Sequence, residues 1–206
     1  MPTFSLPRLY PILDCSCFAD DAALFAAARA LADAGCTLLQ YRNKTGSSRE
    51  MLSHARELRR IFGRRITLIM NDRADLALAG DFDGVHVGQD DLTVAAVRRI
   101  VGPKLIVGTS THDPDQVREA DSALPDYIAI GPVFATGSKA HPDPVVGLEG
   151  VRLARSLTDK PLVAIGGITV EHARSVIAAG ADSLALISAL LPDTAKSIAQ
   201  FQRVLM

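Results

Sequence analysis

The sequence has few cysteines and almost no net charge. Its three cysteines, Cys15, Cys17 and Cys36, are odd in number and lie close together, which suits neither a disulfide framework nor a structural zinc site. With 22 basic and 23 acidic residues the formal net charge is −1, and the basic residues are scattered along the chain. The positive stripe of a nucleic-acid binder is therefore missing. We expect small buried thiols and no nucleic-acid partner.

Long apolar runs and targeting segments are also missing. Hydrophobic residues make up 48% of the 206 and charged residues 22%, which argues against disorder, yet no apolar stretch is long enough to cross a bilayer. The first eight residues lack the basic and then apolar layout of a secretory signal. We expect a soluble cytoplasmic protein with no membrane partner. No Pro/Ser-rich linker divides the chain, so one domain is expected over residues 1–206, while the oligomeric state stays open, a homo-oligomer included.

The common catalytic motifs are absent too. There is no G-x-S-x-G elbow, no Walker loop and no Rossmann fingerprint, and the five histidines show no H-E-x-x-H pairing. His86 lies inside an apolar run, where we expect a hydrogen-bonded structural residue. His112, close to Ser110, is the one histidine that spacing leaves open as a base.

The chain does contain a regular alternation of two kinds of segment. Eight short apolar runs are typical of buried strands: Leu9–Leu13, Thr37–Tyr41, Ile66–Met70, Gly84–Val87, Leu105–Gly108, Tyr127–Ile130, Leu162–Ile165 and Ser183–Ile187. Eight segments with helical spacing lie between and after them: Asp21–Ala34, Ser48–Phe62, Ala74–Ala79, Thr93–Val101, Pro114–Ala123, Leu148–Leu157, Val170–Ala179 and Thr194–Leu205. Capping residues precede several helices, at Asp20, Ser47, Asp113 and Thr169.

This alternation predicts an α/β protein with a (β/α)₈ TIM barrel. A doubly wound open sheet has the same alternation, but it does not explain why polar clusters follow so many different strands. In a barrel, all these clusters gather at one rim. We therefore favour the barrel.

The cluster after the second strand is basic. Gln40, Arg42 and Lys44 are spaced by two residues, so all three side chains can leave the same side of the chain. An arginine fork and a lysine point charge together suit the oxygens of a diphosphate. A solvated loop is the other interpretation of this cluster.

Acidic residues follow the next two strands. Asp72 and Asp91 follow the third and fourth strands, which are neighbours in a barrel, so their carboxylates can approach one point. Mg²⁺ takes one or two protein carboxylates and completes its octahedron with water and substrate phosphate oxygens. We predict Mg²⁺ at Asp72 and Asp91, and expect Asp90 to cap the helix near Thr93.

Small residues and hydroxyls follow the last three strands. Gly166-Gly167 and Ile187-Ser188 stand where barrels commonly bind a phosphate through backbone N–H groups. Thr136, Ser138 and Lys139 add two hydroxyls and a cation. Residues 135–146 are rich in small residues and are expected to act as a lid, unless they form only a surface loop.

Taken in order, six motifs resemble thiamine phosphate synthases over strands two to eight. They are Gln40-Tyr41-Arg42-Asn43-Lys44, Asn71-Asp72-Arg73, His86-Val87-Gly88-Gln89-Asp90-Asp91, Gly131-Pro132-Val133-Phe134 with Thr136, Ser138 and Lys139, Ile165-Gly166-Gly167-Ile168, and Ile187-Ser188-Ala189. The family usually has threonine at the position of Ser138, and an aliphatic and an acidic residue at those of Tyr41 and Asn43.

The resemblance implies a transferase that couples hydroxymethylpyrimidine diphosphate to hydroxyethylthiazole phosphate, or its carboxylate, with Mg²⁺ and release of pyrophosphate. It implies that the pyrimidine diphosphate is held by Gln40, Tyr41, Arg42, Asn43, Lys44, Asn71, Ser110 and Lys139. It implies that the thiazole phosphate is held by Thr136, Gly137, Ser138, Gly167, Ile187 and Ser188. Arg42, Lys44, Ser110 and Lys139 would carry catalysis, and a carbocation-like pyrimidine would form as pyrophosphate leaves.

Two other functions remain open at the level of sequence. A related thiazole tautomerase shares the barrel and the phosphate end, but has little need of the basic and acidic residues; His112 would be its base. A phosphate-binding barrel without activity is the other alternative, although a binder needs no cluster of charges around a leaving group.

Lys139→Ala is expected to lower kcat far more than it raises KM for the thiazole phosphate. The reason is that its contact with the diphosphate strengthens as the bond breaks. Steady-state kinetics with each substrate varied in turn measure both constants. A preserved kcat with equal losses of affinity for the two substrates would contradict this role.

Overall fold

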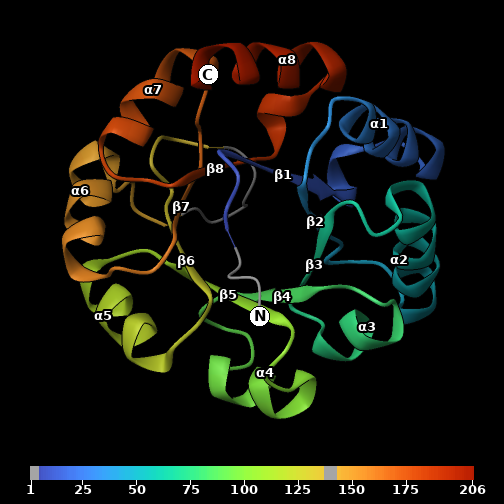
Figure 1. The fold of residues 1–206 in the computed structure, drawn as a ribbon, viewed down its shortest axis with the longest axis horizontal. Helices are drawn as coiled ribbons and strands as arrows, with labels where there is room; N and C mark the ends of the chain where they lie inside the picture. Colours follow the sequence, from blue (N-terminus) through green and yellow to red (C-terminus); the bar gives the residue numbers. More distant parts are fainter. Residues whose placement is uncertain (1–4, 137–142) are drawn as a thin grey trace.

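Eight parallel strands form a closed barrel in the computed structural model, which describes residues 5–136 and 143–206 (Figure 1). Each strand pairs with the next along the chain, and β8 pairs with β1 to close the ring. The strands are β1 (Leu9–Asp14), β2 (Leu38–Arg42), β3 (Thr67–Asn71), β4 (Gly84–Val87), β5 (Ile106–Thr111), β6 (Tyr127–Ile130), β7 (Leu162–Ile165) and β8 (Ser183–Leu186). The predicted (β/α)₈ barrel is confirmed.

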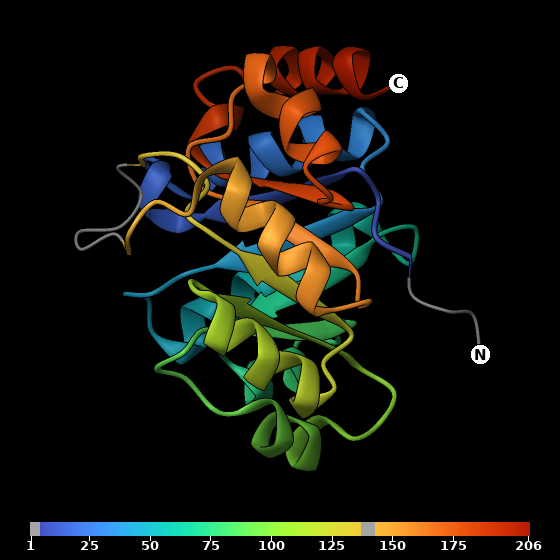
Figure 2. The ribbon, with the colours of Figure 1, turned by 90° about the vertical axis from the view of Figure 1, so that its left-hand side faces the viewer.

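Helices surround the barrel as an outer ring (Figures 1 and 2). They are α1 (Asp21–Asp33), α2 (Ser48–Phe62), α3 (Ala74–Ala79), α4 (Val94–Val101), α5 (Pro114–Ala123), α6 (Gly147–Leu157), α7 (Val170–Ala178) and α8 (Thr194–Leu205), with short 3₁₀-helices at Cys15–Cys17 and Ser188–Leu190. Asp20, Ser47 and Asp113 accept N–H bonds as predicted caps do. Thr169 makes no side-chain cap bond, and α4 is capped by Thr93, so the expected cap at Asp90 is wrong.

Apolar side chains pack in two separate layers. The larger layer lies between the strands and the helices and includes Leu39, Leu68 and Val107. The smaller layer fills the barrel itself, where Leu38 and Ile69 pack against two tyrosines, Tyr10 and Tyr127. Since alternate residues of a strand face opposite sides, each strand contributes to both layers. The inner layer is thus a solid floor beneath the rim where the strands end.

Four strands run further toward that rim than the sequence predicts. β1 includes Asp14, β2 includes Arg42, β3 includes Asn71, and β5 extends to Thr111 and so includes Ser110. These polar residues continue the strand pairing, as Asn71 opposite His86 shows. Apolar periodicity ends before them, which is why it places the strand ends too early. The polar residues consequently stand on rigid strand ends.

The opposite end of the barrel carries three equivalent ion pairs. An aspartate just before β4, β6 and β8 pairs with an arginine of α2, α4 and α6: Asp83 with Arg59, Asp126 with Arg98, and Asp182 with Arg155. Each carboxylate also accepts the N–H of a residue in the preceding strand: Leu68, Val107 and Leu162. The Arg59 side chain is only 12% exposed and also donates to the Asp81 and Gly63 carbonyls.

The three cysteines are free and half-buried. Burial raises the pKa of Cys15 and of Cys36 to about 11, so these thiols stay protonated near neutral pH. Within residues 5–136 and 143–206, no helix combines the length and the hydropathy that crossing a membrane requires.

Asp126→Ala is expected to lower the free energy of unfolding by about 1–3 kcal/mol, because it leaves the Val107 N–H and Arg98 without their shared acceptor. Asp115→Ala is the matched control, since Asp115 pairs with Arg118 at the surface and is 89% exposed. We expect the control to change stability by less than about 0.5 kcal/mol. Urea unfolding measures both values, and equal effects of the two substitutions would contradict a special role for the three pairs.

Candidate active site

The carboxyl ends of the strands surround a polar cavity of about 670 Å³. Eight of the predicted substrate, catalytic and metal residues line it: Gln40, Arg42, Lys44, Asn71, Asp72, Asp91, Ser110 and Ile187. A smaller and more apolar cavity of about 100 Å³ adjoins it and is lined by the predicted residues Thr136, Gly167, Ile187 and Ser188. Ser110, His112 and Ile187 line both cavities. The structure therefore brings these predicted residues together at one rim.

Two predicted residues do not face the cavity. The Tyr41 side chain points out of the barrel, where it is buried and its hydroxyl lies 2.9 Å from His54 Nδ1 on α2. Asn43 contacts Tyr41 and Glu50, and it accepts the backbone N–H groups of the turn that leads into α2. Alternation along the strand explains both positions, since Tyr41 and Asn43 alternate with Gln40 and Arg42 and therefore face the opposite side. Tyr41 and Asn43 support the loop and do not line the cavity.

Three predicted residues, Gly137, Ser138 and Lys139, lie outside the described part of the chain. The expected lid over residues 135–146 overlaps the same gap. Of its described end, Val146 N–H bonds to the Pro132 carbonyl, which ties the start of α6 to the end of β6.

Each cation of the larger cavity is paired with a carboxylate. Arg42 pairs with Asp14, whose side chain is 3% exposed and also accepts from the N–H and hydroxyl of Ser16. Lys44 pairs with Asp72. The sequence analysis missed Asp14, the last residue of β1, because only the pairing of β1 with β2 places it opposite Arg42.

Asp72 and Asp91 interact directly, as predicted from their places after neighbouring strands. Burial raises the pKa of Asp72, and the nearby Asp91 carboxyl raises it further against the effect of Lys44. Burial also opposes ionisation of Asp91, but hydrogen bonds from Asp72 and from the Gly88 N–H lower its pKa. Asp72 has a left-handed backbone (φ 62°), and its N–H bonds to the His86 carbonyl at 2.8 Å. The two carboxyls therefore lose their protons at different pH values, Asp91 first and Asp72 later, which is typical of two carboxyls crowded together.

Beneath Ser110 lies His86, which is buried between two hydroxyls. Its Nε2 is 2.8 Å from Ser110 Oγ and its Nδ1 is 3.0 Å from the Tyr127 hydroxyl. Burial lowers the pKa of His86 to about 4. His86 is therefore a neutral hydrogen-bonding residue, which agrees with the prediction from its position inside a strand.

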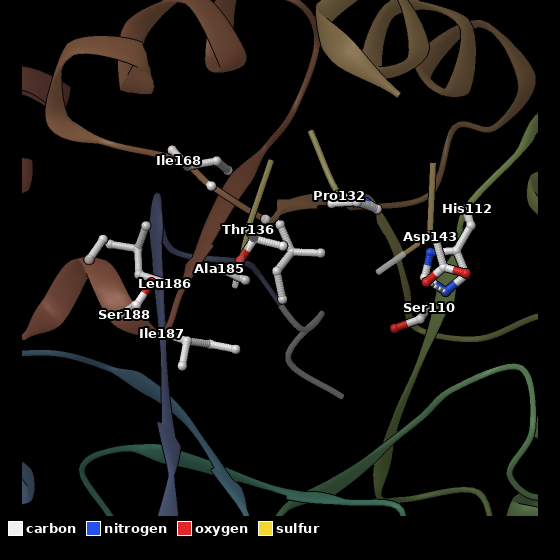
Figure 3. Close-up of a pocket in the computed structure, with 14 residues that line it drawn as sticks. Ser110, His112, Pro132, Thr136, Asp143, Ile168, Ala185, Leu186, Ile187 and Ser188 are labelled. Atoms are coloured by element: carbon white, nitrogen blue, oxygen red, sulfur yellow. Dashed lines mark ion pairs between the residues drawn. The ribbon is translucent and has the colours of Figure 1, made fainter. Parts of the chain in front are cut away.

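His112 is engaged on both sides of its ring. Its Nδ1 lies 2.5 Å from the Gly131 carbonyl, which can only accept, so Nδ1 carries a proton. Its Nε2 lies 3.4 Å from Asp143. Figure 3 shows His112, Asp143 and Ser110 grouped on one side of the cavity, across from Ile187 and Ser188. This arrangement ties the end of β5 to the segment that precedes α6.

Gly167 has a packing role that the sequence did not reveal. Its backbone is left-handed (φ 63°), and a Cβ there would lie 2.4 Å from the Ala135 carbonyl oxygen. Beside it, the Gly166 carbonyl accepts the Phe134 N–H at 3.0 Å. The turn after β7 therefore fits closely against the segment after β6, and both contribute to the smaller cavity.

The stability of the protein is expected to fall as pH is lowered from 6.5 toward 4. In this window the unfolded chain binds a proton at His86 that the folded chain does not, since the folded pKa lies below the unfolded one. The contribution is on the order of 3 kcal/mol. Urea unfolding of the wild type and of His86→Asn at pH 7 and pH 4 isolates it, because other groups titrate in both proteins. A pH dependence that His86→Asn leaves unchanged would count against the buried neutral ring.

Comparison with known proteins identifies the family. The profile of the thiamine monophosphate synthase family matches residues 9–190. A thiamine-phosphate synthase of Koribacter versatilis is 58% identical over 203 residues, covering 97% of this chain and 96% of its own. A second, from Agrobacterium fabrum, is 46% identical over 189 residues, covering 89% and 86%.

A solved structure agrees with the sequence matches. The thiamine phosphate pyrophosphorylase of Pyrococcus furiosus superimposes with a TM-score of 0.85 at 32% identity, covering 96% of this chain and 95% of its own. Relatives that span nearly the whole chain thus carry one kind of name, and the chain is an enzyme, a transferase of thiamine biosynthesis. The chain belongs to the thiamine monophosphate synthase family.

Proposed function

We propose that the chain joins hydroxymethylpyrimidine diphosphate to hydroxyethylthiazole phosphate, or its carboxylate, with Mg²⁺, and releases pyrophosphate. One observation carries the proposal: a wide cavity lined by two cations and two interacting carboxyls adjoins a small apolar cavity. The wide cavity suits a diphosphate and the apolar cavity suits a thiazole ring. The names of the relatives, thiamine-phosphate synthase and thiamine phosphate pyrophosphorylase, agree with thiamine phosphate as the product of this coupling.

The residues present fit a magnesium ion. The neighbouring Asp91 carboxyl raises the pKa of Asp72 because two carboxylates repel, and a divalent cation would remove that repulsion. Among the described residues no group of three or more His, Cys, Asp or Glu side chains could hold a metal, and Asp72 and Asp91 would supply two protein ligands. This donor set is typical of Mg²⁺ bound partly by substrate phosphate oxygens. Bound there, the ion would neutralise negative charge on the departing pyrophosphate.

The chain's own residues would divide the remaining work. Gln40 and Ser110 would orient the pyrimidine, and Arg42 and Lys44 would exchange their carboxylate partners for diphosphate oxygens. As the C–O bond breaks, its electron pair leaves with pyrophosphate, and the amino group stabilises the resulting pyrimidine cation. The thiazole nitrogen then donates its lone pair to form the C–N bond. No proton is transferred and no protein nucleophile is needed.

The smaller cavity would hold the second substrate next to that cation. Ile187 lines both cavities, so its side chain can exclude water from the space between the two rings. Backbone N–H groups near Gly167 and Ser188 would hold the thiazole phosphate, with Thr136 beside them.

The tautomerase alternative is less well supported. It would use His112 as a base, but Nδ1 already donates to the Gly131 carbonyl and Nε2 faces Asp143. A proton transfer within one substrate would also require neither the Asp72–Asp91 carboxyls nor the cations of Arg42 and Lys44. A pyrophosphate-release assay separates these functions, because only the synthase requires both substrates at once.

Asp72→Asn or Asp91→Asn is expected to lower Mg²⁺-dependent kcat at least 100-fold, since one acceptor of the cation is lost; this corresponds to about 2.7 kcal/mol. Thiazole phosphate binding, measured by calorimetry, should hardly change. Asp75→Asn is the matched control, because Asp75 is a nearby exposed carboxylate that pairs with Arg73. Unchanged rates of either cavity variant at saturating Mg²⁺ would refute the assignment.

A further inference from the structure

A chain of five polar side chains crosses the interior of the barrel beneath the larger cavity. It runs from Gln40 on β2 through Tyr10, Tyr127 and His86 to Ser110 on β5. Its four contacts are Gln40 Nε2 to Tyr10 Oη at 3.0 Å, Tyr10 Oη to Tyr127 Oη at 2.8 Å, Tyr127 Oη to His86 Nδ1 at 3.0 Å, and His86 Nε2 to Ser110 Oγ at 2.8 Å. The two ends line the cavity, Tyr10 and His86 reach its floor, and the three middle residues are at least 93% buried.

The four hydrogen bonds can all be assigned with the donor on the Gln40 side and the acceptor on the Ser110 side. Gln40 Nε2 is an amide nitrogen and can only donate, so Tyr10 Oη accepts from it, which leaves the Tyr10 hydroxyl proton available for a bond to Tyr127 Oη. Directing the Tyr127 proton to Nδ1 then gives each phenol one donated and one accepted bond. The proton of the neutral imidazole is thereby placed on Nε2, which donates to Ser110 Oγ.

The direction of these hydrogen bonds decides whether Gln40 and Ser110 present a donor or an acceptor to a ligand. Ser110 Oγ already accepts from His86, so its own hydroxyl proton is directed to the cavity. Gln40 has its amide nitrogen turned to Tyr10, so its Oε1 is the acceptor that it offers to the cavity. One end of the chain therefore donates while the other accepts.

The packing of the barrel holds the central ring of the chain in place. Gly108 lies opposite Tyr127 in the pairing of β5 with β6, and a Cβ there would lie 2.0 Å from Tyr127 Cζ. Tyr10 packs edge-on against the same ring, with centroids 5.8 Å apart. Any larger residue at position 108 would displace the ring, so the space for the chain is built into the sheet.

We propose that Tyr10, Tyr127 and His86 are positioning residues that make Ser110 a hydrogen-bond donor and Gln40 an acceptor, and so select an aminopyrimidine. An aminopyrimidine offers an amino N–H to an acceptor and a ring nitrogen to a donor. The corresponding oxopyrimidine has the reverse pattern, with a ring N–H and a carbonyl oxygen. This inference rests on the proposed function for the identity of the ligand. The direction of the hydrogen bonds from Gln40 to Ser110 can be tested without any ligand.

The first test needs no substrate. Nitrogen NMR of the imidazole should show His86 as the neutral tautomer with its proton on Nε2 at pH 7. A proton on Nδ1 would overturn the proposal, because Ser110 would then donate to the ring and offer only an acceptor. An enzyme that fails to couple the two substrates would contradict the proposed function, and the tautomer would still decide this inference.

The second test measures selectivity. The wild type should bind the aminopyrimidine diphosphate about 100-fold more tightly than the oxopyrimidine diphosphate, because the wrong ring leaves polar groups unpaired. In Tyr127→Phe no hydroxyl donates to Nδ1 of His86, so the tautomer of the ring is no longer fixed. We therefore expect this ratio to fall about tenfold. Binding calorimetry gives the ratio without turnover, and an unchanged ratio in the folded variant would overturn the proposal.

Three further variants separate positioning from a loss of stability. Thr111→Val is the matched control, because it removes a fully buried hydroxyl that bonds to the Ala129 carbonyl, one residue from Ser110. It should leave the ratio unchanged.

Ser110→Ala combined with Tyr127→Phe should cost no more selectivity than Ser110→Ala alone, since Tyr127 acts through Ser110. Additive losses would overturn the proposal. Should Tyr127→Phe not fold, the tautomer of His86 in the wild type decides the proposal.

Discussion

Closure of the sheet is the constraint on which the rest of the structure depends. Pairing of β8 with β1, with Tyr10 opposite Ala185, turns an open row of strands into a ring with an interior. Because side chains alternate along each strand, every strand then sends half of its residues into that interior. Apolar residues and two tyrosines fill the floor, and polar residues are left at the rim. The substrate cavity is the unfilled upper part of the same interior.

Charge balance at the rim explains how such a site is stable without a ligand. Arg42 is held by Asp14 and Lys44 by Asp72, so neither cation is buried alone. The same pairs keep the cations at fixed positions above the floor. A diphosphate would bring negative charge to Arg42 and Lys44, and a metal at Asp72 would replace the positive charge that Lys44 supplies there. Asp14 would keep the N–H and the hydroxyl of Ser16 as donors.

The two ends of the barrel use charge for different purposes. At the amino end, Asp83, Asp126 and Asp182 each bind a strand N–H and an arginine from a helix, which fastens the helix ring to the sheet. At the carboxyl end, the ion pairs are open to a cavity and can be exchanged. This division matches the general separation of stability and catalysis in barrels of this type.

Local patterns in the sequence determined the elements and much of the rim. Apolar periodicity gave the eight strands and helices, and spacing by two residues placed Gln40, Arg42 and Lys44 on one side, because both patterns depend only on near neighbours. The outward direction of Tyr41 and Asn43 follows from the same alternation, although the resemblance to the family had placed them in the site. The roles of Gly137, Ser138 and Lys139 stay predictions from that resemblance.

Only the tertiary structure decided which distant residues meet. Asp14 and Arg42 are 28 residues apart, His86 and Tyr127 are 41 apart, and Tyr10 and Tyr127 are 117 apart. No local pattern records such contacts, since they arise from the stagger of strands around a closed ring. The sequence by itself thus determined the barrel and the residues at its rim, while strand register and closure of the sheet decided which of their side chains meet in ion pairs and hydrogen bonds.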